Sequence, residues 1–324
     1  MPVLRLIKLH LPRSEIYWWI ESGFAPLLEG DPDLAGVVRF DRRGWASPTH
    51  WLEPVRSVQW VRQQSFDWVI DLQALARSAI FGWFADGGLT VGLDDSREWA
   101  SGFYDIIVPR PQGRTHAADW YLEVLTALKV PIHRDFAWLP SRPNVGEQVR
   151  QKWPVEHHRW IALQPGARWI NKRWPVEHFG ELIRQFGRKH PDFRFVILGG
   201  HDDTGLGQAI SAADTKRCLD LTGKSSLNEM VEWIRLCDLM VTNDTGPMHV
   251  AAALGKPLVA LLGPTNPQRT GPYRRPEDVL QLDLPCVPCM KSRCTYVKEM
   301  ECLRAISPAK VLEAMETRLG LGAD

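Results

Sequence analysis

Short apolar runs recur along the second half of the chain, and a polar turn follows each of them. The runs at 160–163, 193–198, 239–241 and 258–262 have the uninterrupted apolar character of strands that are buried on both faces. Helical spacing fills residues 176–189 and a segment that Ser225 or Ser226 would cap. Strands that alternate with helices form a parallel sheet, and their polar turns meet at its carboxyl edge. The pattern therefore predicts an α/β fold with a ligand site at that edge.

The first half of the chain shows a similar but less regular pattern. Residues 3–11 place apolar side chains on one helical face, segments 15–20, 68–72 and 88–92 read as strands, and 114–130 reads as an amphipathic helix. From residue 139 to residue 158, prolines stand among polar residues, which predicts an interdomain linker. We expect two domains, residues 1–145 and 146–324, each long enough to bury its own core.

The stretch DTGPMHVAAALGKP, residues 244–257, lies between two apolar runs and reads as a tight turn that opens a helix. Asp244 or Thr245 is expected to cap this helix, Pro247 suits its first turn, and Gly255 suits its end. Unpaired N–H groups at a helix start favour an anion such as phosphate. An ordinary strand-to-helix turn has the same spacing, so both interpretations stay open at this point.

Two further turns carry charge beside a strand end. In QPGARWINKRWP, Gly166 permits close backbone approach, and Arg168, Lys172 and Arg173 supply positive charge. This composition favours a phosphate site over a solvated loop. The turn GGHDD, residues 199–203, adds a glycine pair and two aspartates that can accept hydrogen bonds from ribose hydroxyls. In the first half, Gln73, Arg77 and Ser78 follow a strand and can contact an anionic ligand, although a solvated Arg77 is the commoner case.

Composition excludes some classes of protein. The chain has 39 Lys and Arg against 38 Asp and Glu, so it lacks the positive field typical of nucleic-acid binding. No apolar run reaches the roughly 18 residues of a membrane helix, and the start MPVLRLIKLHLPRSE lacks the apolar core of a signal peptide. We expect a cytoplasmic protein with no nucleic-acid partner.

Four of the six cysteines form the pattern C-x2-C-x4-C-x7-C, at Cys286, Cys289, Cys294 and Cys302. Four thiolates can hold a structural zinc ion in a closed tetrahedral site. Reduced thiols without a ligand are the ordinary state in a cytoplasmic protein, and disulfides are not expected there. Both zinc and free thiols remain open from the spacing.

The run NDTGPMHVAAALGKPLVALLGPTNP resembles the signature of glycosyltransferase family 9, the ADP-heptose:lipopolysaccharide heptosyltransferases. The segments QPGARWINKRWP, LTGKSSL, DLQALARSA and HAADWYLEVL support the resemblance, each in the family's order. It implies the GT-B fold, in which two Rossmann-like domains face a cleft and the last helix folds back on the first domain. The nucleotide sugar is then expected on the C-terminal domain and the acceptor on the N-terminal one.

The resemblance also implies a reaction and its partners. Heptose would move, with inversion at its anomeric carbon, from ADP-heptose to the lipopolysaccharide inner core, with no cofactor required. The acceptor would be a lipid-linked saccharide, which implies peripheral contact with the cytoplasmic face of the inner membrane. A similar cysteine run in the second-heptose branch of the family favours that branch.

Site residues are carried over by matching positions. Lys172 matches the family's lysine that contacts phosphate and sugar, and Asp244 matches the aspartate that contacts the heptose. His249 is either a phosphate ligand or a packed core histidine. The expected donor-binding residues are Gly166, Arg168, Lys172, Gly199, Asp202, Ser225, Asp244, Thr245, Gly246 and His249, and the expected acceptor-side residues are Gln73, Arg77 and Ser78.

The start of the chain departs from the family. Family members begin with an apolar strand and a Gly-Asp turn whose aspartate is proposed as the general base. Here the sequence starts at what resembles the following helix, so we expect the first strand of the N-terminal domain to be missing and identify no catalytic base. A start codon placed too late and a true truncation both explain this. The chain as it stands is expected to be inactive or nearly so, and the alternatives to a transferase are an inactive sugar-nucleotide-binding pseudoenzyme and a GT-B sugar-nucleotide epimerase.

Overall fold

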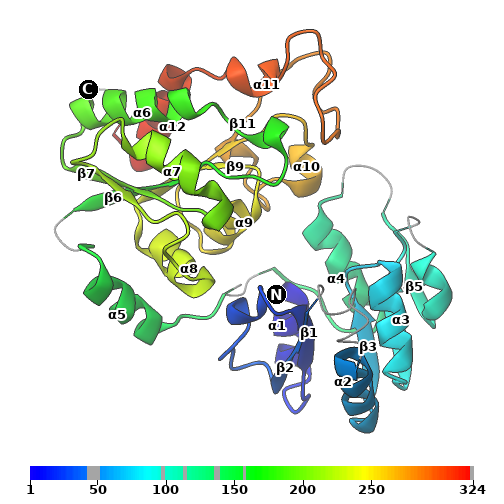
Figure 1. Cartoon of the computed structure of the whole chain (residues 1–324). Coiled ribbons are helices and arrows are strands. Elements are labelled where there is room, and N and C mark those ends of the chain that lie inside the picture. The colour runs from blue at the N-terminus through cyan, green and yellow to red at the C-terminus, as the bar shows by residue number, and fades with distance from the viewer. Residues whose placement is uncertain (42–51, 96–98, 112–114, 135–138, 156–157, 322–324) are drawn as a thin grey trace. The chain divides into compact units, whose positions relative to one another are not determined.

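A computed structural model describes residues 1–41, 52–95, 99–111, 115–134, 139–155 and 158–321. The chain forms two compact units, Met1–Pro140 and Ser141–Asp324 (Figure 1). We refer to them as the first and the second unit. The boundary expected from the sequence, after residue 145, lies slightly later in the chain.

The second unit is built on a six-stranded sheet with the order β11-β10-β9-β6-β7-β8. Every neighbouring pair is parallel, which confirms the predicted parallel sheet. Strands that follow β6 add to one side of it, and strands that follow β9 add to the other, so the winding reverses between these two strands. Ligands of doubly wound sheets bind at the carboxyl ends that flank such a reversal. The strands are β6 (Arg159–Gln164), β7 (Phe193–Ile197), β8 (Cys218–Asp220), β9 (Leu239–Asn243), β10 (Leu258–Leu261) and β11 (Val279–Leu280).

Helices cover both faces of this sheet (Figure 1). Because side chains alternate along a strand, β6 sends Ile161 and Leu163 into one core and Trp160 and Ala162 into the other. The first core is closed by α6 (Val176–Lys189), α7 (Thr204–Ser211) and α12 (Pro308–Leu319), and the second by α5 (Pro143–Lys152), α8 (Leu227–Leu236) and α9 (Gly246–Ala253). Burial on both faces explains the uninterrupted apolar runs. Short helices complete the unit: η4 (Ile170–Lys172), η5 (His201–Asp203), α10 (Pro267–Thr270), η6 (Pro276–Asp278) and α11 (Glu301–Arg304).

The helix start predicted at Ser225 or Ser226 is confirmed. The Ser226 hydroxyl accepts a hydrogen bond from the Glu229 amide at 3.2 Å, and the Glu229 carboxylate accepts one from the Ser226 amide at 2.7 Å. This reciprocal pair is the capping box expected at the start of α8. Ser307 caps α12, which packs against α6 and β10 within the second unit. Packing of this helix on the first domain stays a prediction.

The prediction of a linker over residues 139–158 is wrong for the part that forms a helix. Helix α5 occupies residues 143–152, with Pro143 in its first turn, where the missing N–H of proline has no helical partner to lose. Val149 is the fully buried apolar residue of this helix, so the sequence carried little helical periodicity. Residues 156–157 lie outside the described part of the chain.

The first unit contains two parallel sheets. In the described strands, β1 (Tyr17–Glu21) pairs with β2 (Gly36–Phe40), and β3 (Trp68–Asp71), β4 (Leu89–Leu93) and β5 (Ile106–Val108) form the other sheet. The predicted opening helix is confirmed as α1 (Pro2–His10), whose Leu6 and Ile7 pack against α4 (Ala117–Ala127). Leu11 follows the helix and is exposed, so the predicted helical face extended one position too far. The remaining helices are η1 (Ala25–Leu27), α2 (Leu52–Gln63), α3 (Ala76–Phe84) and η3 (Ala100–Phe103).

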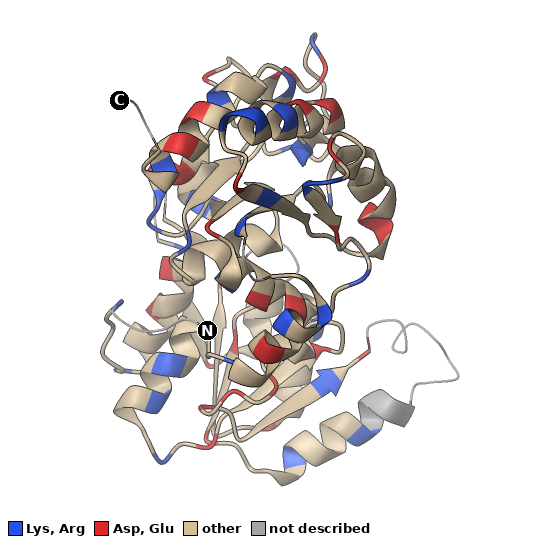
Figure 2. Cartoon of the chain, turned by 90° about the vertical axis from the view of Figure 1, so that its left-hand side faces the viewer, with Lys and Arg blue, Asp and Glu red and all other residues tan. Residues whose placement is uncertain are grey.

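The charge distribution agrees with the near-equal numbers of acidic and basic residues. Figure 2 shows Lys and Arg interspersed with Asp and Glu along the helices and loops. None of the described helices is both long enough and apolar enough to cross a membrane.

Candidate functional site

Two of the predicted donor-binding residues meet at the point where the winding of the six-stranded sheet reverses. Lys172 lies in the loop after β6, and Asp244 directly follows β9. The Lys172 ammonium Nζ lies 2.8 Å from Asp244 Oδ2, and the two side chains are 17% and 6% exposed. Two turns that are distant in sequence therefore form one partly buried ion pair at the carboxyl edge of the sheet.

Two further side chains orient this pair. The Lys172 ammonium lies 4.7 Å from the centre of the Trp169 ring, within the range of a cation–π contact. The Thr265 hydroxyl donates a hydrogen bond to Asp244 Oδ2, the oxygen that also contacts Lys172. Sequence reasoning missed Thr265. The available signal was its position just after the apolar run 258–262, at the same edge of the sheet.

The start of α9 is arranged differently from the prediction. Thr245 is the N-cap residue, but no side chain caps the helix, because the Asp244 carboxylate is engaged by Lys172 and Thr265. The predicted N-cap position of Thr245 is thus confirmed, but neither Asp244 nor Thr245 caps the helix with its side chain. A helix start without a side-chain cap can offer its N–H groups to an anionic ligand. The other end agrees with the prediction, since Gly255 follows α9 with a left-handed φ of +65°.

Gly166, in the loop after β6, makes room for the side chain of Asp203. A Cβ atom on Gly166 would lie 2.3 Å from Asp203 Oδ2, so this position admits no side chain without a shift. Asp203 also accepts a hydrogen bond from the Gly200 amide at 3.1 Å. The loops after β6 and β7 are thus packed together, and of the two aspartates it is Asp202 that is exposed, beside the half-buried Gly199.

The other predicted donor-side residues lie around this edge. Arg168 is exposed in the loop after β6, and Gly246 is exposed at the start of α9. Ser225 is half-buried in the turn before α8 and leaves the capping role to Ser226. His249 is exposed on the first turns of α9, which excludes the interpretation as a packed core histidine.

The acceptor-side residues belong to the first unit, after β3. Gln73 is exposed, Arg77 is half-buried on α3, and Ser78 is buried. The Ser78 hydroxyl donates to the Leu75 carbonyl at 2.9 Å and accepts from the Leu75 amide at 3.2 Å, so it closes the start of α3. Helix α3 begins at Ala76, three residues later than the segment QALARSA suggested.

A buried carboxylate in the same turn escaped the sequence analysis. Asp71 ends β3 and accepts hydrogen bonds from the Gln73 amide at 2.8 Å and from the Tyr104 hydroxyl at 2.7 Å. Burial and the charge of Asp71 raise the pKa of Tyr104 well above its usual range. Gly92 allows this contact, because a Cβ atom there would lie 2.2 Å from the Tyr104 ring.

The four clustered cysteines are free thiols in the structure. Burial, with smaller contributions from Cys286, Cys294 and Cys289, raises the pKa of Cys302 to about 11. Within the ranges that the structure describes, no three His, Cys, Asp or Glu side chains are grouped in a way that would hold a metal ion. Zinc binding by this cluster stays a prediction.

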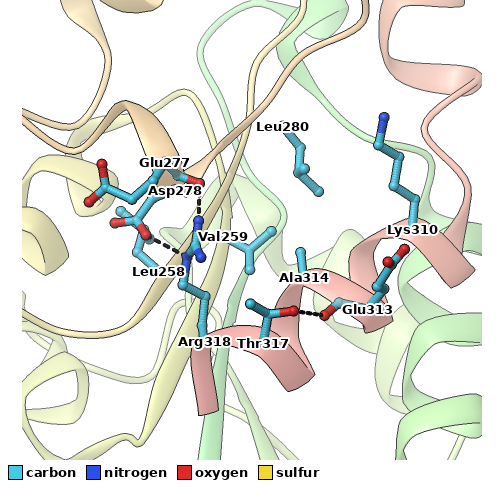
Figure 3. Close-up of a pocket in the computed structure, with 10 residues that line it drawn as sticks. All are labelled: Leu258, Val259, Glu277, Asp278, Leu280, Lys310, Glu313, Ala314, Thr317 and Arg318. Atoms are coloured by element: carbon cyan, nitrogen blue, oxygen red, sulfur yellow. Dashed lines mark hydrogen bonds and ion pairs between the residues drawn. The ribbon is translucent and has the colours of Figure 1, made fainter. Parts of the chain in front are cut away.

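A pocket of about 230 Å³ lies apart from the predicted site, between α12, the edge strand β11 and its neighbour β10 (Figure 3). Its buried carboxylate, Asp278, is paired with Arg275 and with Arg318 Nε, the latter at 2.8 Å. Burial raises the pKa of Asp278 above its usual range, against the effect of the two arginines. None of the predicted donor-binding residues lines this pocket, so we do not assign the site to it.

The chain matches the model of "Glycosyltransferase family 9 (heptosyltransferase)" over residues 55–299. It is 27% identical to lipopolysaccharide heptosyltransferase 1 of Pseudomonas aeruginosa, over 98% of this chain and 93% of that protein. It is also 40% identical to lipopolysaccharide heptosyltransferase 2 of Escherichia coli K12, over 38% of this chain and 36% of that protein.

Solved structures share the fold. The structure of E. coli ADP-heptose lipopolysaccharide heptosyltransferase II aligns with a TM-score of 0.79 at 24% identity and covers 99% of this chain and 94% of its own. A family 9 glycosyltransferase from Veillonella parvula aligns with a TM-score of 0.82, also at 24% identity, over 99% and 93% of the two chains.

Proposed function

Since this chain belongs to glycosyltransferase family 9, the heptosyltransferases, we propose that it transfers heptose from ADP-heptose to the inner core of lipopolysaccharide. Support comes from the heptosyltransferase relatives, one of which aligns over 98% of the chain. These relatives do not favour a sugar-nucleotide epimerase or an inactive binding protein.

The observation that carries the donor side of this proposal is the ion pair of Lys172 and Asp244 beside the start of α9. Departure of ADP from the anomeric carbon develops negative charge on the diphosphate, and fixed cations and N–H groups stabilise such charge. In our proposal, Lys172 and the amides of Thr245 and Gly246 bind the diphosphate. The Asp244 carboxylate then accepts hydrogen bonds from the heptose hydroxyls.

The other donor-side assignments follow from position. Arg168 and His249 are exposed at the same edge and add positive charge or hydrogen-bond donors near the phosphates. Asp202, with Gly199 beside it, is proposed to contact the ribose, and Ser225 the nucleotide near the turn before α8. We assign no general base to a residue of this chain.

For the acceptor side, we propose that Gln73 and Arg77 contact an anionic part of the lipid-linked saccharide, and that Ser78 holds their turn in place. Work on a lipid-linked acceptor also implies transient contact with a membrane surface from the cytoplasmic side. In this proposal, transfer from ADP-heptose requires no cofactor. Zinc bound by the cysteine cluster would have a structural role only.

ADP binding tests the donor site. Titration calorimetry should give a measurable dissociation constant for the wild-type chain, and Lys172→Ala should weaken it by about tenfold or more, because a charge-assisted contact to phosphate is lost. The matched control is Lys216→Ala, an exposed lysine just before β8 and therefore at the opposite edge of the sheet. Equal affinities of the wild type and Lys172→Ala would remove the donor-site assignment.

The class of reaction needs a separate assay. If the chain is an active transferase, ADP release from ADP-heptose should depend on a lipopolysaccharide acceptor, and no release with or without acceptor would agree with the low activity expected for the sequence as it stands. Release of nucleotide without any acceptor would instead point to the epimerase alternative.

A further inference from the structure

Asn243 connects three parts of the proposed donor site. It is the last residue of β9 and is fully buried. Its side-chain amide Nδ2 donates to the Pro165 carbonyl at 2.7 Å, and its Oδ1 accepts from the Trp174 amide at 3.0 Å. Pro165 and Trp174 stand at the two ends of the loop from Gly166 to Arg173, so one side chain fixes both ends of that loop.

The next residue in the chain is Asp244, the partner of Lys172 in this loop. The backbone of β9 therefore sets the loop ends through Asn243 and presents the carboxylate for Lys172 one residue later. Inside the loop, the side-chain amide Nδ2 of Asn171 donates to the Lys291 carbonyl at 2.9 Å, and Arg173 Nε donates to the Ala167 carbonyl at 2.9 Å. These contacts hold the middle of the loop, whereas Asn243 bonds to the residue at each end of it.

The chemistry of this position explains why an amide is required. The Pro165 carbonyl needs a donor, and the Trp174 amide needs an acceptor, both in a buried place where an unpaired polar group is costly. A planar amide supplies both from one side chain. An ionised carboxylate of the same shape supplies only acceptors, and an aliphatic side chain supplies neither.

We propose that Asn243 is a positioning residue that holds the loop from Gly166 to Arg173 against β9, and thereby keeps Lys172 at the diphosphate end of the donor site. This inference rests on the proposed donor site. It assigns to Asn243 no contact with the substrate, since its side chain is occupied by the two backbone groups. Loss of the side chain therefore acts on the donor through Lys172.

The test compares three variants with the wild type. Asn243→Leu removes both hydrogen bonds at similar volume. Asn243→Asp keeps the shape of the side chain, but its carboxyl group can donate a hydrogen bond only when it is protonated. Val241→Ala, also fully buried in β9, removes apolar packing but neither hydrogen bond to the loop ends, and serves as the control for a merely structural effect.

Two readouts are measured under conditions in which all four proteins are folded. In Asn243→Leu, we expect hydrogen exchange in peptides covering residues 165–174 to be faster by about tenfold or more, and ADP affinity to fall by a similar factor, because two buried hydrogen bonds are lost. In Val241→Ala, the melting temperature should fall, while both readouts stay within about twofold of the wild type.

Asn243→Asp adds a pH profile that a structural role would not produce. A protonated carboxyl group can donate to the Pro165 carbonyl and accept from the Trp174 amide, as the amide does. Because this position is fully buried, the pKa of the introduced carboxyl group should lie well above the usual value of about 3.9. After correction for intrinsic exchange, the loop of this variant should therefore approach wild-type protection as the pH falls from about 8 to about 5, and its ADP affinity relative to the wild type at the same pH should rise in parallel.

The outcomes separate this inference from the proposed function. Wild-type loop exchange in Asn243→Leu overturns the positioning role, whatever the protein binds. Faster loop exchange with unchanged ADP affinity, where Lys172→Ala has lost affinity, overturns the link from Asn243 to Lys172. If neither the wild type nor any variant binds ADP, the donor-site assignment fails, and the link to the donor fails with it.

Discussion

At the scale of single residues, the buried carboxylate of Asp71 depends on its donors. It ends β3 and accepts hydrogen bonds from the amides of Gln73 and Ala74 and from the Tyr104 hydroxyl. A buried charge without partners is strongly unfavourable, so these donors decide whether the turn after β3 is stable. The turn carries Gln73 and leads into α3, where Arg77 lies.

Tyr104→Phe removes one donor from Asp71 without changing the packing of the ring. We expect the free energy of unfolding of the first unit to fall by about 1.5 to 3 kcal/mol, the range for hydrogen bonds to charged groups. Urea unfolding at pH 8 measures it. The control is Tyr17→Phe in β1, since the ring of Tyr17 contacts Trp60 and Phe66 and should keep those contacts.

The hydrogen bond from Tyr104 to Asp71 should also make the stability of the protein depend on pH. The pKa of Tyr104 is raised in the folded state by burial and by Asp71, whereas it is about 10 in the unfolded chain. The stabilisation by the neutral hydroxyl is therefore fully present below pH 10 and is lost as the pH rises above it, because the unfolded state releases the proton first. The difference in stability between the wild type and Tyr104→Phe should narrow between about pH 10 and 11. A constant difference over this range would contradict the prediction.

Cysteine reactivity should divide the six thiols into two groups. Burial raises the pKa of Cys218 and Cys237 to about 12 and that of Cys302 to about 11, and the thiolate is the reactive form. At pH 8, iodoacetamide should label the half-exposed Cys286, Cys289 and Cys294 first, as timed mass spectrometry would record. Equally fast labelling of Cys237 would contradict the assignment, and protection of all four clustered cysteines by added Zn²⁺ would support the zinc hypothesis.

The sequence indicated where Lys172 and Asp244 lie better than it indicated their contacts. Lys172 and Asp244 could be placed at one sheet edge because parallel strands end there together. The partner of Asp244 could not be predicted, because a carboxylate beside a helix start can either cap the helix or pair with an ammonium group. The structure has the ion pair, with Thr265 as a second donor. The contacts of Asn243 could not be predicted for a similar reason, since the spacing of residues does not give the direction of a side chain.

At the scale of elements, local signals decided which predictions succeeded. Helix α6 was predicted with its observed bounds, because Phe179, Leu182, Ile183 and Phe186 repeat at helical spacing and are all buried. The three-residue strand β8 was missed, because its residues are only half-buried and its pairing with β7 is set by distant contacts. Helix α5 was not predicted, because the prolines of residues 139–158 indicated a linker. Long elements with one buried face are readable from sequence, whereas short edge elements depend on their neighbours.

The contact between the loops after β6 and β7 gives a prediction at this scale. Gly166→Ala places a methyl group against the Asp203 carboxylate and should lower the free energy of unfolding by about 1 to 3 kcal/mol, the usual cost of overpacking. Because the clash is with the Asp203 side chain, Gly166→Ala combined with Asp203→Ala should be no less stable than Asp203→Ala alone. Denaturant unfolding of the two single variants and the double variant measures this coupling.

A control for this cycle lies in α7. Gly205 has no atom within 4 Å of an added Cβ, so Gly205→Ala should leave stability unchanged or raise it by up to about 1 kcal/mol through helix propensity. Additive losses in the cycle would show that Asp203 is not the group that Gly166 accommodates.

At the scale of the whole molecule, the proposed reaction is divided between the two units. The proposed donor-binding residues all belong to Ser141–Asp324, and the proposed acceptor-side residues all belong to Met1–Pro140. The sequence predicted two domains because the strand and helix pattern restarts after the prolines. Each unit also has buried clusters of its own, for example around Leu125 in the first and Phe186 in the second. Donor binding can therefore be tested on the intact chain, unit by unit.

ADP should stabilise the second unit by an amount set by its affinity. At about 100 times its dissociation constant, a ligand that binds only the folded form adds about 2.7 kcal/mol. Hydrogen exchange of the intact chain should slow in peptides covering residues 164–174, 199–203 and 243–249, and Lys172→Ala should remove most of this protection. Peptides around Gln73 and Arg77 should change little with ADP alone, because their proposed ligand is the acceptor. Protection that is strongest in the first unit would place the nucleotide there and reverse the assignment of donor and acceptor sides.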